Sequence, residues 1–164
     1  MKSLFTNLNN KVNNLLKEES SLISQVKKKV EEKHLQIPIS SEMILYILKR
    51  QNIEGISNLD VTILEESMKI SGLAKKMMVS INFSIDLKPI SASGRVITFE
   101  VISMKPLNQE WIKKIVFNRP TVLSYEDNCI MIDINELESI KKIPIGKIKG
   151  FSIKENKLYV DFGV

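Results

Sequence analysis

The chain offers few residues that could carry out covalent chemistry. It has 164 residues with one cysteine, Cys129, and one histidine, His34, which are far apart in the sequence. A cysteine nucleophile needs a base within hydrogen-bond reach, and a zinc site needs several cysteine, histidine or carboxylate ligands. Cys129 stands among Ile130, Met131 and Ile132, which is typical of a small buried thiol. The sequence therefore predicts neither a thiol catalyst nor a zinc centre.

Carboxylates are more numerous, but their spacing does not suit acid–base catalysis. They include the neighbouring pairs Glu18–Glu19, Glu31–Glu32 and Glu65–Glu66. Side chains that are adjacent in sequence point in different directions on a helix or a strand, so such pairs do not converge on one substrate. The chain also has no glycine-rich phosphate-binding motif and no Gly-x-Ser-x-Gly motif. We expect a non-enzymatic protein without a metal or a cofactor.

The charge balance bears on the choice of partner. The net charge is +5 and the isoelectric point is about 9.2, which favours anionic partners such as nucleic acid or an anionic bilayer. Arginine, the residue best suited to reading phosphate or guanine, occurs only at Arg50, Arg95 and Arg119. Nucleic-acid binding is therefore not expected.

The sequence shows neither a secretory signal nor a membrane span. The first residues, MKSLFTNLNNKV, carry asparagines where a signal peptide has an unbroken apolar stretch. A run of about 18 apolar residues, the length of a membrane helix, is also absent. We expect a cytoplasmic protein, with peripheral contact at the inner face of the membrane as an alternative.

Regular elements must position whatever binding chemistry remains, and the clearest of them is a strand. From Val79 to Leu87 every second residue is apolar, and serine, asparagine and aspartate stand between. This alternation predicts a strand with one apolar and one polar face. Residues 59–64, 68–74 and 95–104 carry similar patterns, and successive strands of this kind favour an antiparallel meander.

Two turns and one glycine complete the expected meander. Turns are predicted at 65–67 and at 88–94, where proline and glycine interrupt the alternation. Gly72, inside a strand pattern, predicts a bulge, a bend or a close approach of the backbone. The apolar face of the two central strands is expected to point inward, and it consists of Val79, Ile81, Phe83, Ile85, Ile97, Phe99 and Val101.

Helical patterns lie on both sides of the meander in the sequence. Residues 42–51 place four apolar residues on one face of a helix that Ser40 or Ser41 would cap. Residues 106–117 predict a second helix, which begins at Pro106 and ends before Pro120.

The C-terminal third alternates again. It predicts a strand at 128–134, then a short helical turn capped by Asp133 or Asn135, and a closing hairpin that turns at 154–157. The fold class is therefore α+β, with a strongly curved antiparallel sheet wrapped around helices.

The first 36 residues are interpreted as a helical segment, and residues 37–164 as the sheet domain. Apolar residues recur at spacings of three, four and seven from Phe5 to Val30, which predicts an amphipathic helix. Its apolar stripe could pack on the domain, pair with a second copy in a homodimer, or lie on an anionic membrane. Self-packing or dimerisation is favoured because the polar face is rich in asparagine and its basic charge is diluted by glutamates.

Several segments between Ile44 and the C-terminus follow one another in a recognisable order: MKISGLAK, VSINFSIDLKP, GRVITFEVISMKPL, IMIDINEL and PIGKIKGFSIKENKLYVDF. The order of helix, three-strand meander, helix, strand, short turn and final hairpin resembles the tubular lipid-binding (TULIP) superfamily. The resemblance is in particular to the bacterial LmeA-like phospholipid-binding domains.

The resemblance implies a lipid held in an elongated groove between sheet and helices, and no catalytic residues. The expected ligand is a lipid, a fatty acid or another elongated apolar molecule, because short helices would leave part of a longer strand uncovered. The alternative is a dry-cored structural or protein-interaction module that associates through its N-terminal helix. The residues expected to line the groove are Ile44, Leu48, Ile81, Phe83, Ile85, Phe99, Trp111 and Ile115.

Overall fold

The computed structural model describes residue 25 and residues 35–164, and these form an α+β fold of antiparallel sheets and short helices. The α+β class expected from the sequence is confirmed. Residues 1–24 and 26–34 of the N-terminal segment lie outside the described residues, and with them lie His34 and the three modes of association expected for that segment. The expected boundary at residue 36 is wrong, because Leu35 and Gln36 are part of a strand and not of a helical segment.

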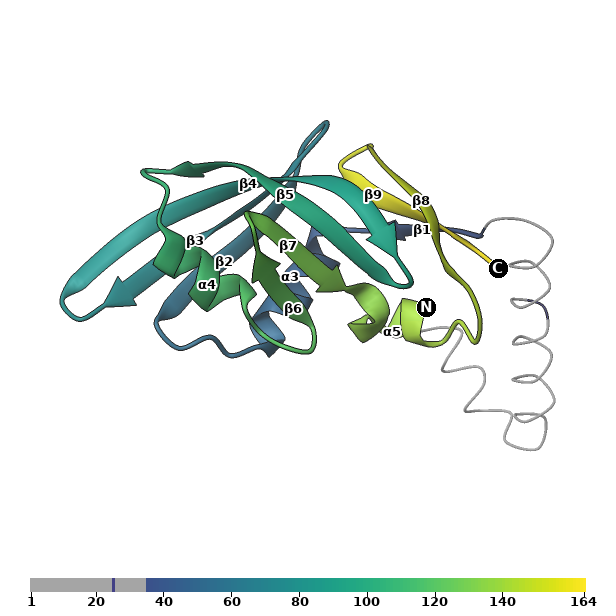
Figure 1. Ribbon diagram of the computed structural model, residues 1–164, viewed down its shortest axis with the longest axis horizontal. Helices are drawn as coiled ribbons and strands as arrows, with labels where there is room; N and C mark the ends of the chain where they lie inside the picture. The colour runs from purple at the N-terminus through teal and green to yellow at the C-terminus, as the bar shows by residue number, and fades with distance from the viewer. Residues whose placement is uncertain (1–24, 26–34) are drawn as a thin grey trace.

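The larger sheet of the described chain has six strands in the order β2-β3-β4-β5-β7-β6. Its first four strands form the antiparallel meander that the alternating segments predict. The six strands are β2 (Ile56–Ile63), β3 (Met68–Lys76), β4 (Val79–Ser93), β5 (Val96–Lys105), β6 (Leu123–Glu126) and β7 (Cys129–Asp133) (Figure 1).

The smaller sheet has three strands in the order β1-β9-β8. The closing hairpin is confirmed, since β8 and β9 pair around the predicted turn. Strand β1 is not predicted by the alternation, and Pro38 lies within it. An edge strand tolerates proline because one of its sides has no partner to which an N–H must donate. The three strands are β1 (Leu35–Ile39), β8 (Lys147–Lys154) and β9 (Lys157–Gly163).

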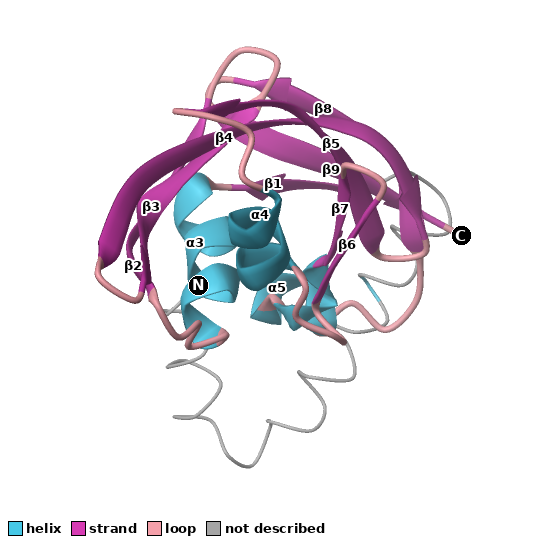
Figure 2. Ribbon diagram, turned by 60° about the vertical axis from the view of Figure 1, so that its left-hand side comes forward, coloured by secondary structure: helices cyan, strands magenta, loops and turns pink. Residues whose placement is uncertain are grey.

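The helices lie together on one side of the strands (Figure 2). Helix α3 begins after Ser40, whose hydroxyl caps its first turn as predicted. Helix α4 begins at Glu110 and not at Pro106, because Gln109 is extended and its amide donates to the Met104 sulfur at 3.2 Å. The helical elements are α3 (Ser41–Arg50), α4 (Glu110–Phe117), the 3₁₀ turn η1 (Ile134–Glu136) and α5 (Glu138–Lys141).

Strand β4 is longer than its alternation predicts. A turn is expected over residues 88–94, but the strand continues to Ser93 and the turn is formed by Gly94 and Arg95. Pro89 is accommodated because pairing with β3 ends at Leu87, and the pairing with β5 shifts register between Pro89 and Ser91. The proline therefore lies at a bulge in a stretch that has lost one neighbouring strand.

The β6–β7 hairpin follows α4, and its first strand is not predicted because LSYE is short and carries no long alternation. Its turn residues, Asp127 and Asn128, have φ values of 51° and 61°, as a two-residue hairpin turn requires. Asp133 then caps η1 as predicted, because its carboxylate accepts a hydrogen bond from the Asn135 amide at 2.9 Å.

Gly72 marks a close approach, which is one of the three roles expected for it. A Cβ atom at this position would lie 3.0 Å from the Phe83 ring and 3.1 Å from the Ser57 carbonyl oxygen. The pairing of β2 with β3 also shifts register between Ser57 and Asp60. Glycine thus lets the Phe83 ring lie directly on the backbone of β3.

One core connects both sheets with α3, α4 and α5. The expected inner face of β4 and β5 contributes Phe83, Ile85, Ile97, Phe99 and Val101, which are all buried. Ile81 is only partly buried. Val79 was assigned to the same face and is 58% exposed, because it adjoins the β3–β4 turn at the far end of the sheet (Figure 1). The inner-face prediction is therefore wrong for Val79.

Arg95 connects the β4–β5 turn to the C-terminal part of the chain. Its guanidinium lies over the Phe162 ring, 5.2 Å from the centroid, and burial lowers its pKa while Asp133 raises it in part. It donates to four oxygen atoms at 2.8–3.1 Å: the carbonyls of Ile140, Ile143 and Gly146 and the amide oxygen of Asn135. The arginine therefore holds the loop after α5 against the larger sheet.

Candidate functional site

The eight residues expected to line a groove divide into two groups. One group is buried in the core and comprises Ile44, Leu48, Phe83, Ile85 and Phe99. The other group is partly exposed, packs against the edge of that core, and comprises Ile81, Trp111 and Ile115. A ligand could contact the second group without displacing any packed side chain. Ile81 and Trp111 lie where the β3–β4 hairpin meets the start of α4, and this is the candidate site. Ile115 lies one helical turn further along α4.

Two hollows that are open to solvent touch members of the buried group. One has a volume of about 540 Å³ and is lined by Asn82, Phe83, Ser84, Lys105 and Pro106, where β5 ends. The other, of about 420 Å³, lies between the end of α3 and β2 and includes Leu48 and Ile53. The first hollow begins one residue beyond Ile81 along β4, but Ile81, Trp111 and Ile115 are not among its lining residues.

The start of α4 is tied to the β3–β4 hairpin through Trp111. The indole Nε1 donates to the Gln109 side-chain oxygen at 3.2 Å. The Lys76 ammonium lies 5.3 Å from the centroid of the indole ring, within the range of a cation–π contact. Lys76 pairs with Val79 across the hairpin, so these contacts place the end of the hairpin beside the tryptophan.

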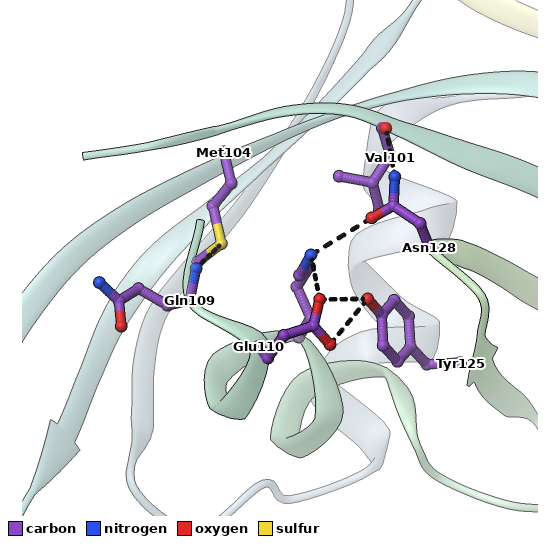
Figure 3. A network of polar contacts seen from close by, with 7 residues as sticks. Val101, Met104, Gln109, Glu110, Tyr125 and Asn128 are labelled. Carbon is purple, nitrogen blue, oxygen red and sulfur yellow. Dashed lines mark hydrogen bonds and ion pairs between the residues drawn. The ribbon is translucent and has the colours of Figure 1, made fainter. Parts of the chain in front are cut away.

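A polar network holds α4 against the β6–β7 hairpin (Figure 3). Lys113 is fully buried, and its Nζ lies 2.7 Å from Glu110 Oε1 and donates to Asn128 Oδ1 at 3.2 Å. The Tyr125 hydroxyl donates to both Glu110 oxygens at 3.0 and 3.1 Å. The Asn128 side-chain amide donates in turn to the Val101 carbonyl at 3.0 Å. The buried ammonium is thus paired and hydrogen-bonded, as a buried charge must be.

The pKa shifts in this network follow from the same contacts. The hydrogen bond from Lys113, and after it the one from Tyr125, lowers the pKa of Glu110. Burial lowers the pKa of Lys113, but the hydrogen bond to Glu110 and the proximity of Tyr125 outweigh it, and the pKa is raised overall. Burial raises the pKa of Tyr125. Lys113 therefore stays protonated at neutral pH, which suits an anchor and not a nucleophile.

In the described part of the chain, no group of three or more histidine, cysteine, aspartate or glutamate residues could hold a metal ion. Cys129 is partly exposed, not buried as its neighbours suggest. Among the same residues, no helix has the length and apolarity needed to cross a bilayer.

Sequence reasoning missed two features of this region. Lys113 stands in a helical pattern as one of two lysines, and only Glu110, three residues earlier, signals an ion pair. Met77 and Met78 stand between two lysines and a strand, and they form the turn of the β3–β4 hairpin. Paired apolar residues in a turn are a signal that the sequence does contain, because turns usually carry polar residues, glycine or proline.

Comparisons of the chain with models of protein families, with curated proteins and with solved structures find no significant match.

Proposed function

We propose that this chain binds a lipid or another elongated apolar ligand without catalysis, beside the start of α4 and beneath the end of the β3–β4 hairpin. The observation that carries the proposal is the loss of cover along one face of β4. Ile85 is fully buried, Phe83 is 3% exposed, Ile81 is partly exposed and Val79 is mostly exposed. Trp111 is also partly exposed and lies beside the same end of the strand.

The dimensions of the elements support this location. Helix α4 has eight residues and is about 12 Å long, whereas the fifteen residues of β4 extend to about 50 Å. The resemblance to the TULIP superfamily favours a strongly curved sheet that holds its lipid against helices. On this interpretation an acyl chain would lie along the apolar face where the helices end, and each buried methylene would contribute about 0.8 kcal/mol.

The burial of the inner face favours a second candidate, a dry-cored structural or protein-interaction module. Five of the eight residues expected to line a groove are covered by the chain's own side chains. In such a module the exposed end of β4 would contact another macromolecule in place of a lipid. The two candidates differ in whether a small apolar molecule binds beside Trp111.

Tryptophan fluorescence distinguishes the two candidates, because Trp111 is the only tryptophan in the chain. Titration with a long-chain fatty acid should shift its emission, and native mass spectrometry of the purified protein should show a bound lipid. Ile81→Ser should weaken the response. Ile90→Ser is the matched control, since Ile90 is an exposed isoleucine of the same strand about 30 Å away. An unchanged emission together with a lipid-free mass would leave the dry-cored module as the function.

A further inference from the structure

The end of the β3–β4 hairpin projects beyond both neighbouring strands. Pairing between β2 and β3 ends at Ile56 and Ala74, and pairing between β4 and β5 ends at Ser84 and Lys105. Residues 75–80 therefore pair only with one another as strands. In Figure 1 this hairpin forms the left-hand extremity of the described chain, beyond α4.

The turn of this hairpin is apolar, unlike two comparable turns in the same chain. Met77 is 89% exposed and Met78 is 96% exposed. Met77 has a φ of 57°, a backbone conformation that asparagine, aspartate and glycine adopt more readily. The β6–β7 and β8–β9 turns use the polar pairs Asp127–Asn128 and Glu155–Asn156 at positive φ. An exposed methionine pair at a turn contributes nothing to the core and so points to a partner.

The charges around the turn specify the kind of partner. Lys75 and Lys76 are exposed and immediately precede the methionines. Residues 75–80 contain two lysines and no acidic residue, so the end of the hairpin is basic. One exposed carboxylate, Glu54, precedes Gly55, whose carbonyl accepts a hydrogen bond from the Lys75 amide. Flexible apolar side chains beside lysines match a bilayer surface, where the methionines enter the acyl boundary and the ammonium groups meet phosphates.

We infer that the β3–β4 hairpin docks on an anionic phospholipid bilayer, with Met77 and Met78 inserted and with Lys75 and Lys76 facing the head groups. The inference does not depend on a lipid being held beside Trp111. A second copy of the chain is a poorer occupant, because two hairpins meeting at their turns would bring their lysines together. Docking is peripheral, since only the hairpin end is inserted.

Flotation of the full chain with vesicles tests this inference. The protein should float with vesicles of phosphatidylcholine and phosphatidylserine, should float much less with phosphatidylcholine alone, and should dissociate as salt is raised. The double variant Met77→Ser/Met78→Ser should lower the apparent partition by about tenfold or more. Lys75→Glu should lower it as well and reduce the salt dependence. Leu64→Ser, at the exposed β2–β3 turn, is the matched control and should bind as the parent does.

Three results would overturn the inference. In the first, the parent chain fails to float with anionic vesicles. In the second, the methionine variant floats as well as the parent does, which would place the membrane contact elsewhere in the chain. Sedimentation velocity could also show that the methionine variant changes the oligomeric state without any vesicle binding, which would make the turn a contact between copies. Titration with a fatty acid, followed by Trp111 fluorescence, tests the proposed lipid binding separately. The lipid-binding proposal and the membrane-docking inference can therefore each fail without the other.

Discussion

The two turns at the ends of β4 hold side chains in environments that are the reverse of their usual ones. At the β3–β4 turn, two methionines are exposed to solvent. At the β4–β5 turn, the guanidinium of Arg95 is enclosed by four oxygen acceptors and an aromatic ring. The difference shows that the burial of a side chain at these turns depends on whether a later segment of the chain packs against it, and not on its own hydropathy.

The inner face of β4 shows the same principle within a single strand. Its alternation continues unbroken from Val79 to Leu87, yet cover is complete only from Phe83 onward. The pattern identifies the face that points inward, whereas the helices that pack on it decide how far it is covered. The covered and uncovered parts of β4 can therefore be compared with the same substitution at equivalent positions.

The largest effect is expected where cover is complete. Ile85→Asp should lower the free energy of unfolding by about 4 kcal/mol or more, because it places an unpaired carboxylate in the core and removes packed methyl groups. Val79→Asp, on the same face of the same strand, should cost less than about 1 kcal/mol. Urea denaturation of both variants measures the difference, and similar losses would contradict the assigned boundary of the core.

Local patterns predicted much of this fold. The meander, α3 with its Ser40 cap, the Asp133 cap and the closing hairpin all depend on residues that are close in sequence. Strand β1 could not be found in this way, because its partner β9 lies more than a hundred residues later in the chain. The continuation of β4 through Pro89 depends on where β3 stops pairing, which no local pattern encodes.

The next effect in size concerns the enclosed turn. Arg95→Ala should lower the free energy of unfolding by about 3 kcal/mol, since it leaves partly buried carbonyls of the loop after α5 without a donor. Arg95→Lys should recover little, because an ammonium cannot match the fork of a guanidinium. Thermal unfolding monitored by circular dichroism compares this loss with that of Arg50→Ala. The Arg50 side chain is exposed, and within the described residues it donates a hydrogen bond to Tyr46. Equal effects at the two arginines would contradict the role given to Arg95.

The candidate site was less accessible to sequence reasoning than the fold. Trp111, Ile81 and Ile115 were identified together with five residues that prove to be buried, because periodicity assigns all eight to apolar faces. The buried residues can be told from the partly exposed ones only when the positions at which the helices begin and end are known. Helix α4 in turn begins after Gln109, whose extended backbone and hydrogen bond to the Met104 sulfur have no sequence signature.

A smaller effect is expected at the edge of the covered region. Gly72→Ala should cost about 1–3 kcal/mol, because the new Cβ would meet the Phe83 ring and the Ser57 carbonyl at about 3 Å. Gly150→Ala is the matched control, since a Cβ there would lie at an ordinary distance of 3.4 Å from the Asp161 carboxylate. Chemical denaturation measures both variants. A neutral Gly72→Ala would show that the Phe83 ring is free to move and that the core ends before it.

The smallest effect is a pH dependence at the start of α4. The pKa of Glu110 is lowered from its usual 4.5, first by the hydrogen bond from Lys113 and then by that from Tyr125. A carboxylate with a lowered pKa in the folded state contributes stability above pH 4.5, and loses that contribution as the pH falls through the lowered value. The stability difference between the parent and Glu110→Gln should therefore be constant above pH 4.5 and shrink below it. Urea denaturation across this acidic range measures the difference.

In a Lys113→Met background the shrinkage should largely disappear, since the main donor is gone. If the stability difference still shrank below pH 4.5 in the Lys113→Met background, the acid sensitivity would come from a contact other than the Lys113 hydrogen bond. Lys113 would then hold α4 in place without lowering the pKa of Glu110.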